Sequence, residues 1–163
     1  SVRVCMGTPV FEPAQIPVDA SGTAFIDQPI EVGGNMWNVT AVSVGNPHCV
    51  VFVDDVEWMD LPSIGPLFEN HPLFPERVNT EFVQVIDRNK LKMRVWERGS
   101  GETMACGTGS SAALAAAVVN GRCENSARLI LRGGELMIEW DRDKNLIYMT
   151  GPAVTVYDGE FLI

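Results

Sequence analysis

One stretch of the sequence, residues 96–111, combines residue types that can bind an anion and move a proton. Its centre is Cys106, which is followed by a Gly-Thr-Gly triplet and then by an alanine-rich run. Because alanine is the best helix former, we predict a helix that begins at this cysteine and ends at Gly121. The helix is apolar nearly all round, which is typical of a buried helix.

The start of a helix would give Cys106 two chemical properties. The first N–H groups of a helix have no internal partner and the dipole makes that end positive, so a carboxylate or phosphate can bind there. Gly107 and Gly109 allow a ligand to approach the backbone closely. The same field lowers the pKa of a thiol, so we predict a thiolate near neutral pH. The simpler interpretation is an inert, buried cysteine.

Two charged residues, Glu97 and Arg98, lie upstream of the cysteine. Adjacent residues of a strand point to opposite faces, so both can serve one site only if the strand breaks at Gly99. In that case Arg98 could bind a carboxylate and Glu97 could hold an ammonium group. Otherwise the pair is the solvated end of a strand, which is the simpler interpretation.

Other polar residues lie in turns and loops. Asn46 belongs to a Gly-Asn-Pro-His turn and Asn79 ends a loop, and the residues alone favour plain turn roles over amides directed at a substrate. His48 could be a general base or a metal ligand, although a hydrogen bond to a backbone carbonyl is commoner. His71 is expected on a surface loop.

The elements that must position these residues are short strands joined mainly by hairpins. We therefore predict an α+β fold, a mainly antiparallel curled β-sheet wrapped around one central buried α-helix. A short second helix is expected at 60–71, and Cys5 is expected to pack inside. The expected strands are 2–6, 23–30, 36–44, 49–53, 80–86, 92–97, 128–131, 135–140, 146–150 and 153–157.

Composition narrows the class of protein. The 163 residues suit one domain or two small lobes, and 46% of them are hydrophobic, which is enough for a core. The formal net charge of −9 argues against nucleic acid as a partner. We find no membrane span and no signal peptide, and four widely spaced cysteines suit reduced thiols, so a cytoplasmic protein is expected.

Four motifs resemble the diaminopimelate epimerase family, in the same order and spacing. They are Asn46-Pro47-His48, Arg77-Val78-Asn79, the block from Trp96-Glu97-Arg98-Gly99 to Cys106-Gly107-Thr108-Gly109, and Tyr148-Met149-Thr150-Gly151-Pro152-Ala153. The resemblance covers essentially the whole chain, and the block that ends at the cysteine is its most specific part.

The resemblance implies a cofactor-independent racemase of the lysine and cell-wall pathway, which interconverts L,L- and meso-diaminopimelate. Members of the family have two similar lobes, each a sheet curled round a central helix that begins at a cysteine. One cysteine, as a thiolate, takes the α-proton, and the other, as a thiol, returns a proton on the opposite face. The resemblance implies neither a cofactor nor a metal.

By the same resemblance, Cys106 is one of the two acid/base thiols. Gly107 and Thr108 would donate backbone N–H groups to the reacting carboxylate and stabilise the charge that develops there. The other residues expected to bind substrate are Asn46, Asn79, Glu97 and Arg98. The resemblance gives His48 no settled role.

The chain resembles only the later lobe of the family. Residues 1–163 are therefore expected to form a single C-terminal lobe, and a last strand at about 153–163 is expected to belong with the N-terminal lobe. The chain begins with Ser1 rather than Met, and we interpret it as a piece of a longer protein.

The cysteine of the earlier lobe has no counterpart here, because Cys5, Cys49 and Cys123 lack glycine-rich helix starts. Proton removal on one face and delivery on the other need two positioned groups, so the chain alone is expected to be inactive. Its expected partners are diaminopimelate, the N-terminal lobe and, in the absence of that lobe, a second copy packed on the face that carries Cys106.

Three other interpretations stay open from the sequence. A proline-type racemase or related isomerase would share the fold and differ in substrate. A thiol hydrolase would use Cys106, His48 and an Asn or Asp, and would need the imidazole within hydrogen-bond reach of the sulfur. A metal or anion module would use Cys49, His48 and Cys106, although these lack the paired spacing of zinc sites.

Overall fold

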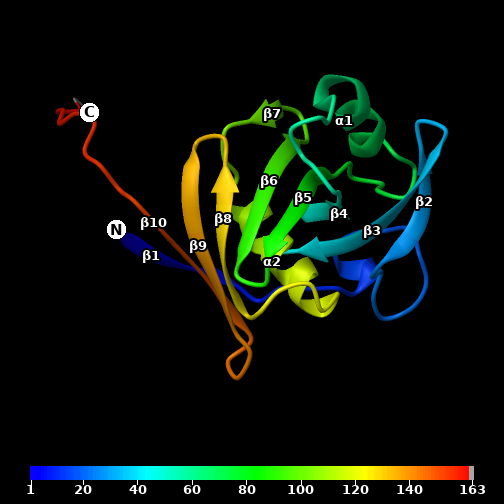
Figure 1. Cartoon of the computed structure of the whole chain (residues 1–163), viewed down its shortest axis with the longest axis horizontal. Helices are drawn as coiled ribbons and strands as arrows, with labels where there is room; N and C mark the ends of the chain where they lie inside the picture. Colours follow the sequence, from blue (N-terminus) through cyan, green and yellow to red (C-terminus); the bar gives the residue numbers. More distant parts are fainter. Residues whose placement is uncertain (162–163) are drawn as a thin grey trace.

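A computed structural model describes residues 1–161 as one curled β-sheet that encloses a helix (Figure 1). Neighbouring strands follow the order β1-β10-β9-β8-β6-β5-β4-β3-β2, and β7 pairs with β6. The strands are β1 (Val2–Gly7), β2 (Gln28–Val32), β3 (Asn35–Ser43), β4 (Pro47–Phe52), β5 (Asn79–Asp87), β6 (Lys90–Glu97), β7 (Gly101–Thr103), β8 (Ser126–Leu131), β9 (Gly134–Asp141) and β10 (Leu146–Gly151). The helices are a 3₁₀ turn η1 (Pro13–Gln15), α1 (Leu61–Glu69) and α2 (Gly107–Val119).

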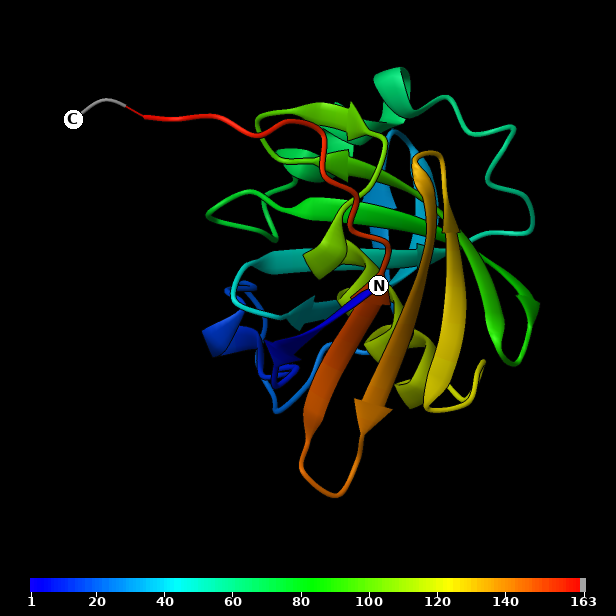
Figure 2. The ribbon, with the colours of Figure 1, turned by 90° about the vertical axis from the view of Figure 1, so that its left-hand side faces the viewer.

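Strand pairing in the sheet is antiparallel except between β4 and β5 and between β6 and β8. Parallel neighbours need a long crossover, and each of these two crossovers contains a helix, α1 in the first and α2 in the second. Figure 2 shows the sheet curving around α2, so the predicted fold class is confirmed.

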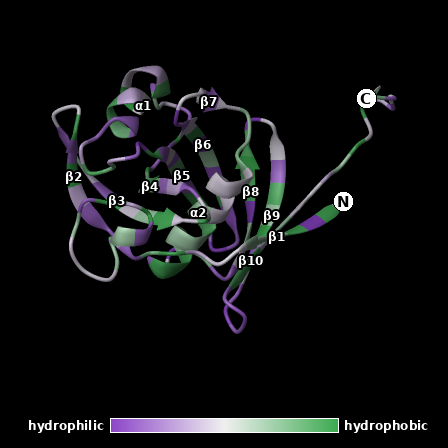
Figure 3. Ribbon diagram, turned by 180° about the vertical axis from the view of Figure 1, so that it is seen from behind, coloured by the Kyte–Doolittle hydropathy of each residue, from purple (hydrophilic) through white to green (hydrophobic). Residues whose placement is uncertain are grey.

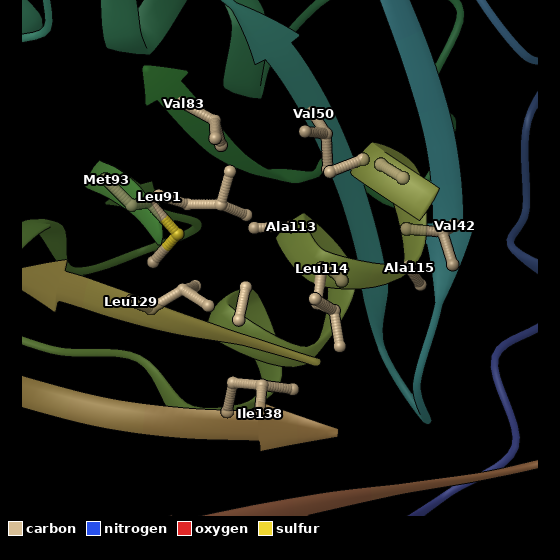
Figure 4. Packing of buried hydrophobic residues seen from close by; sticks show 14 of the residues in the cluster. Val42, Val50, Val83, Leu91, Met93, Ala113, Leu114, Ala115, Leu129 and Ile138 are labelled. Carbon is tan, nitrogen blue, oxygen red and sulfur yellow. The ribbon is translucent and has the colours of Figure 1, made fainter. Parts of the chain in front are cut away.

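Helix α2 is the centre of the larger hydrophobic core. Its residues from Gly109 to Ala117 are buried, and Gly121 has a φ of +68°, which a glycine adopts readily after the last turn. Leu114 is its one large side chain and is fully buried among residues of β3, β4, β5, β6, β8 and β9 (Figure 4). The predicted buried helix is therefore confirmed.

The second helix and the turns follow their local signals. Asp60 accepts a hydrogen bond from the Ser63 amide at the start of α1, as expected of a helix-capping residue. Gly33 and Gly34 form the predicted turn between β2 and β3, with φ angles of +61° and +79°. The charged turn between β9 and β10 projects from the sheet as a polar loop (Figure 3).

Three expectations about the edges were wrong. The strand expected at 153–157 is an irregular, exposed segment that leaves the sheet after β10 (Figures 1 and 2), because no described strand lies beside it to pair with. Cys5 is exposed, since β1 is an edge strand that pairs with β10 alone. The strand expected at 23–30 begins only at Gln28. Residues 162 and 163, the end of the strand expected at 153–163, lie outside the described residues.

No α-helix in residues 1–161 is both long and apolar enough to cross a lipid bilayer.

Candidate active site

Cys106 caps the N-terminus of α2, as the sequence predicted. Its backbone is extended, with φ −140° and ψ 112°, and its Sγ accepts a hydrogen bond from the Gly109 amide at 3.3 Å. The amides of Gly107 and Thr108 donate to no group in residues 1–161, so both are free to bind an anion. Ala105 lines a hollow of about 150 Å³ together with Gly133, Leu136 and Pro152, and Cys106 is not among the residues that line it.

The electrostatics of the sulfur differ from the prediction. The side chain is largely buried, with 8% of the residue exposed, and burial raises the pKa of the Cys106 thiol to about 11. The Glu81 carboxyl adds to this rise, while hydrogen bonds from Thr108 and Gly109 oppose it. The expected lowering of the pKa was therefore wrong, because loss of solvation outweighs the helix start. Near neutral pH Cys106 is a thiol.

A continuous chain of hydrogen bonds leads from the sulfur into the core. Thr108 Oγ1 lies 3.5 Å from Cys106 Sγ and accepts a hydrogen bond from Asn46 Nδ2 at 3.3 Å. Asn46 Oδ1 lies 2.8 Å from Nε2 of His48, whose Nδ1 lies 2.7 Å from Glu81 Oε1. Asn46 is thus more than a turn residue, and His48 contacts side chains rather than the expected backbone carbonyl.

Glu81 is the functional candidate that sequence reasoning missed. It is fully buried on β5, and Oε2 has no hydrogen-bond partner in the described part of the chain. Burial raises the pKa of the Glu81 carboxyl, and the interaction with His48 opposes that rise. The sequence does hold one signal for this residue. Glu81 is the one charged residue in the strand segment from Thr80 to Val83.

A second set of polar contacts holds the neighbouring strand ends together. Asn79 donates from Nδ2 to the Pro47 carbonyl at 3.1 Å and accepts from the Arg98 amide at 2.9 Å. Its amide therefore ties the start of β4 to the end of β6. Arg98 as a whole is half-buried, and its guanidinium donates to the Glu76 carbonyl at 3.0 Å in an exposed position.

The chain reverses direction directly after Glu97, as the glycines there suggested. Gly99 and Gly101 have φ angles of +78° and +79°, and the turn pairs β6 with β7. Glu97 accepts a hydrogen bond from the Thr103 hydroxyl and is close enough to raise the pKa of Cys106 slightly. The strand break at Gly99, without which Glu97 and Arg98 could not serve one site, is therefore present.

Glu69, a second residue not singled out from the sequence, fixes this turn. Its carboxylate accepts hydrogen bonds from the Gly99 amide at 2.8 Å, from Trp96 Nε1 at 2.8 Å and from the Arg77 guanidinium at 2.7 Å. These bonds help to hold the pKa of the Glu69 carboxyl below its usual value despite burial.

The thiol hydrolase and the metal module lack the contacts that they need. Among residues 1–161, no group of three His, Cys, Asp or Glu side chains is arranged to hold a metal ion. The two ring nitrogens of His48 face Glu81 and Asn46, so the imidazole reaches Cys106 only through Asn46 and Thr108. A thiol hydrolase would need a direct hydrogen bond between the imidazole and the sulfur.

The amino-acid sequence of the chain is similar to those of one family of known proteins. A family model described as diaminopimelate epimerase matches residues 40–156. Diaminopimelate epimerases from Acetivibrio thermocellus and Moorella thermoacetica are 54% identical over 159 residues and 53% identical over 160 residues. Each match covers 98% of this chain but only 57% of the relative, so the chain spans little more than half their length.

Among solved structures, a probable proline racemase from Agrobacterium radiobacter aligns with a TM-score of 0.58. The alignment covers 96% of this chain and 54% of that one, at 15% sequence identity. At this identity the likeness concerns the fold alone.

Proposed function

The chain belongs to the diaminopimelate epimerase family, and from this premise we propose that it supplies one half of an epimerase active site. In this proposal the complete site inverts one α-carbon of diaminopimelate between the L,L and meso forms. The observation that carries it is the position of Cys106, a thiol at the N-terminus of α2 beside two amides that have no partner among residues 1–161.

The amides of Gly107 and Thr108 bind the carboxylate of the reacting centre. A helix N-terminus favours an anion by its dipole and by its free donors. When the α-proton leaves, negative charge spreads from the carbon into this carboxylate, and the same donors stabilise it more strongly. The substrate's carboxylate thus places its α-carbon close to the sulfur of Cys106.

Cys106 acts first as the acid. Its pKa of about 11 keeps the sulfur protonated near neutral pH. A base outside this chain removes the α-proton from one face, and Cys106 delivers its S–H proton to the opposite face, which leaves a thiolate. In the reverse direction the Cys106 thiolate takes the α-proton, so the roles of acid and base are exchanged.

Four further residues bind the rest of the substrate in this proposal. Glu97 lies close to Cys106 and suits an ammonium group, and the guanidinium of Arg98 suits a carboxylate. Asn46 contacts Thr108 at the helix start, and Asn79 holds the Arg98 backbone in place. These polar groups favour a substrate with a second amino-acid end over proline, and competition binding with the two compounds separates the alternatives.

The exposed segment after β10 is the part of the chain that would join the missing lobe. Val154, Val156, Tyr157 and Phe161 are each more than 80% exposed. We expect these side chains to be covered when the segment pairs as a strand with residues outside this chain.

The test compares the chain alone with a chimaera, in which it is joined to the part of the Acetivibrio thermocellus relative outside the match. Exchange of the substrate's α-proton for deuterium in D2O is followed by NMR. The chain alone is expected to show no exchange above background, and the chimaera to exchange rapidly. Exchange by the chain alone at the chimaera's rate would contradict the two-lobe arrangement.

A further inference from the structure

Glu69 is a buried carboxylate in a position that does not favour one. It is the last residue of α1, where the helix dipole is negative, and only 7% of the residue is exposed. Burial of a charge also costs free energy unless the charge is paired and hydrogen-bonded. The local stability of the helix therefore does not account for a glutamate here, and its role must follow from the groups that the carboxylate contacts.

The end of α1 packs tightly against the strand that leads into the candidate site. A Cβ built on Gly65 would lie 2.2 Å from the ring of Trp96, so the helix backbone and the indole are in direct contact. Nε1 of the same indole donates to Glu69 Oε2 at 2.8 Å. Figure 1 shows α1 beside β7 and the end of β6. The Glu69 carboxylate is thus held in one place beside the turn that follows Glu97.

The first route from Glu69 to Arg98 runs through the backbone of this turn. Glu69 Oε1 accepts a hydrogen bond from the amide of Gly99 at 2.8 Å, and Asn79 Oδ1 accepts one from the amide of Arg98 at 2.9 Å. These amides belong to the two peptide groups on either side of the Arg98 Cα. Both peptide groups are therefore fixed by side chains, one of which is Glu69.

The second route ends at the Arg98 guanidinium. The Arg77 guanidinium donates to Glu69 Oε1 at 2.7 Å, and Arg77 has a φ of +61°, which is uncommon for a residue with a side chain. The peptide group that precedes Arg77 carries the Glu76 carbonyl, which accepts from the Arg98 guanidinium at 3.0 Å. The conformation of Arg77 therefore directs this carbonyl, and the contact with Glu69 helps to hold that conformation.

We propose that Glu69 is a positioning residue for Arg98: its one carboxylate fixes both the backbone and the guanidinium of Arg98 for binding the carboxylate at the non-reacting end of the substrate. The inference rests on the proposed function, because it takes the role of Arg98 from it. Glu69 acts through Arg98 and does not contact the substrate. The reacting carboxylate is bound separately, by the amides of Gly107 and Thr108, so loss of Glu69 weakens binding and leaves the chemical step largely unchanged.

Amide hydrogen exchange of the 163-residue chain, followed by NMR without substrate, tests the positioning. Glu69→Ala removes the acceptor of the Gly99 amide, so the exchange rate of that amide is expected to rise at least about tenfold. Trp96→Phe is the matched control, because it loses packing beside Glu69 but keeps both hydrogen bonds to Oε1. In this control the exchange rate of Gly99 is expected to change less than about twofold.

A rescue experiment separates positioning from a general loss of stability. Glu69→Gln replaces one carboxylate oxygen by an NH₂ group, which then faces a donor, either Trp96 Nε1 or the Gly99 amide. In the Glu69→Gln/Trp96→Phe double variant the NH₂ group no longer faces the indole donor, and the remaining oxygen can accept from Gly99. The Gly99 amide is therefore expected to exchange more slowly in the double variant than in Glu69→Gln. This comparison decides the question even if Glu69→Ala does not fold.

In the chimaera, steady-state kinetics separates substrate binding from the chemical step. Glu69→Ala is expected to raise the KM for L,L-diaminopimelate about tenfold and to change kcat less than about threefold, because a contact made equally in the ground and transition states acts on KM. A variant that only reduced the amount of folded protein would lower kcat and leave KM unchanged.

An exchange rate of Gly99 in Glu69→Ala within about twofold of the wild-type rate would overturn the inference. Faster exchange in the double variant than in Glu69→Gln would overturn it as well, and so would a lower kcat at unchanged KM. A wild-type chimaera that does not epimerise diaminopimelate would instead overturn the proposed function and the substrate role of Arg98. The exchange rates measure the positioning of the turn independently of that result.

Discussion

The crowding between α2 and the buried carboxyl predicts that two glycines of the same helix turn respond oppositely to alanine. A Cβ at Gly109 would lie 2.7 Å from Glu81 Oε1 and 3.1 Å from Cys106 Sγ. A Cβ at Gly107 would lie 3.0 Å from the sulfur of Met149. The Met149 side chain is flexible and partly exposed and can move aside, whereas Glu81 is fully buried and held by His48.

The expected magnitudes follow from two opposing effects. Alanine in place of glycine stabilises a helix by roughly 0.5–1 kcal/mol, and this gain applies to both positions. Overpacking a rigid site costs about 1–3 kcal/mol and applies only at Gly109. Gly107→Ala is therefore expected to be neutral or stabilising, and Gly109→Ala to destabilise by up to about 2.5 kcal/mol. For a chain of this length that is a fall in Tm of up to roughly 10 °C.

Thermal unfolding followed by circular dichroism at pH 7 measures both variants against the wild-type chain. Glu81→Asp retracts the carboxyl by one methylene, so the cost of Gly109→Ala is expected to shrink by at least about 0.5 kcal/mol in that background. Equal Tm values for the two alanine variants would refute the close packing of Glu81 under the helix start.

Three further predictions concern stability. Leu114→Ala is expected to lower the free energy of unfolding by about 2–5 kcal/mol, measured by urea denaturation, because the fully buried side chain leaves a cavity; an effect below 1 kcal/mol would contradict its central position. Asn79→Ala is expected to cost about 1–3 kcal/mol in the same assay, since the Arg98 amide and the Pro47 carbonyl both lose their partner, and an effect below about 0.5 kcal/mol would contradict this role. The free energy of unfolding is also expected to fall between pH 9 and 11, because folding raises the pKa of Cys106 and Cys123 to about 11. In this range the folded state binds more protons than the unfolded state, so a rise in pH favours unfolding. Urea denaturation at several pH values measures this fall, and a Cys106→Ala variant in which the fall is undiminished would refute the cause.

Local signals were enough to predict the elements that carry the site. The helix after Cys106 follows from alanine propensity, a small-residue start and a glycine stop, and the hairpins follow from paired glycines. Hydrophobic alternation located the central strands within a few residues. The edges were harder to predict because their burial depends on a neighbouring strand, as Cys5 and the segment after β10 show.

The electrostatics of the site required the three-dimensional structure. His48 and Glu81 are 33 residues apart and meet only because β4 and β5 are parallel neighbours. The helix start alone predicts a lowered pKa for Cys106, but burial by the surrounding sheet and the nearby carboxyl reverse the sign. Both causes come from residues distant in sequence, which a local pattern cannot reveal.

The central claim is that Cys106 is one of the two groups that move the substrate's proton. The most direct measurement compares Cys106→Ala with Cys123→Ala in the chimaera, because both thiols are buried and have a pKa of about 11, while Cys123 lies away from the start of α2. Epimerisation of L,L-diaminopimelate is expected to fall by at least about 10²-fold in the first variant and to change less than roughly twofold in the second. Equal activities for the two variants would contradict the claim.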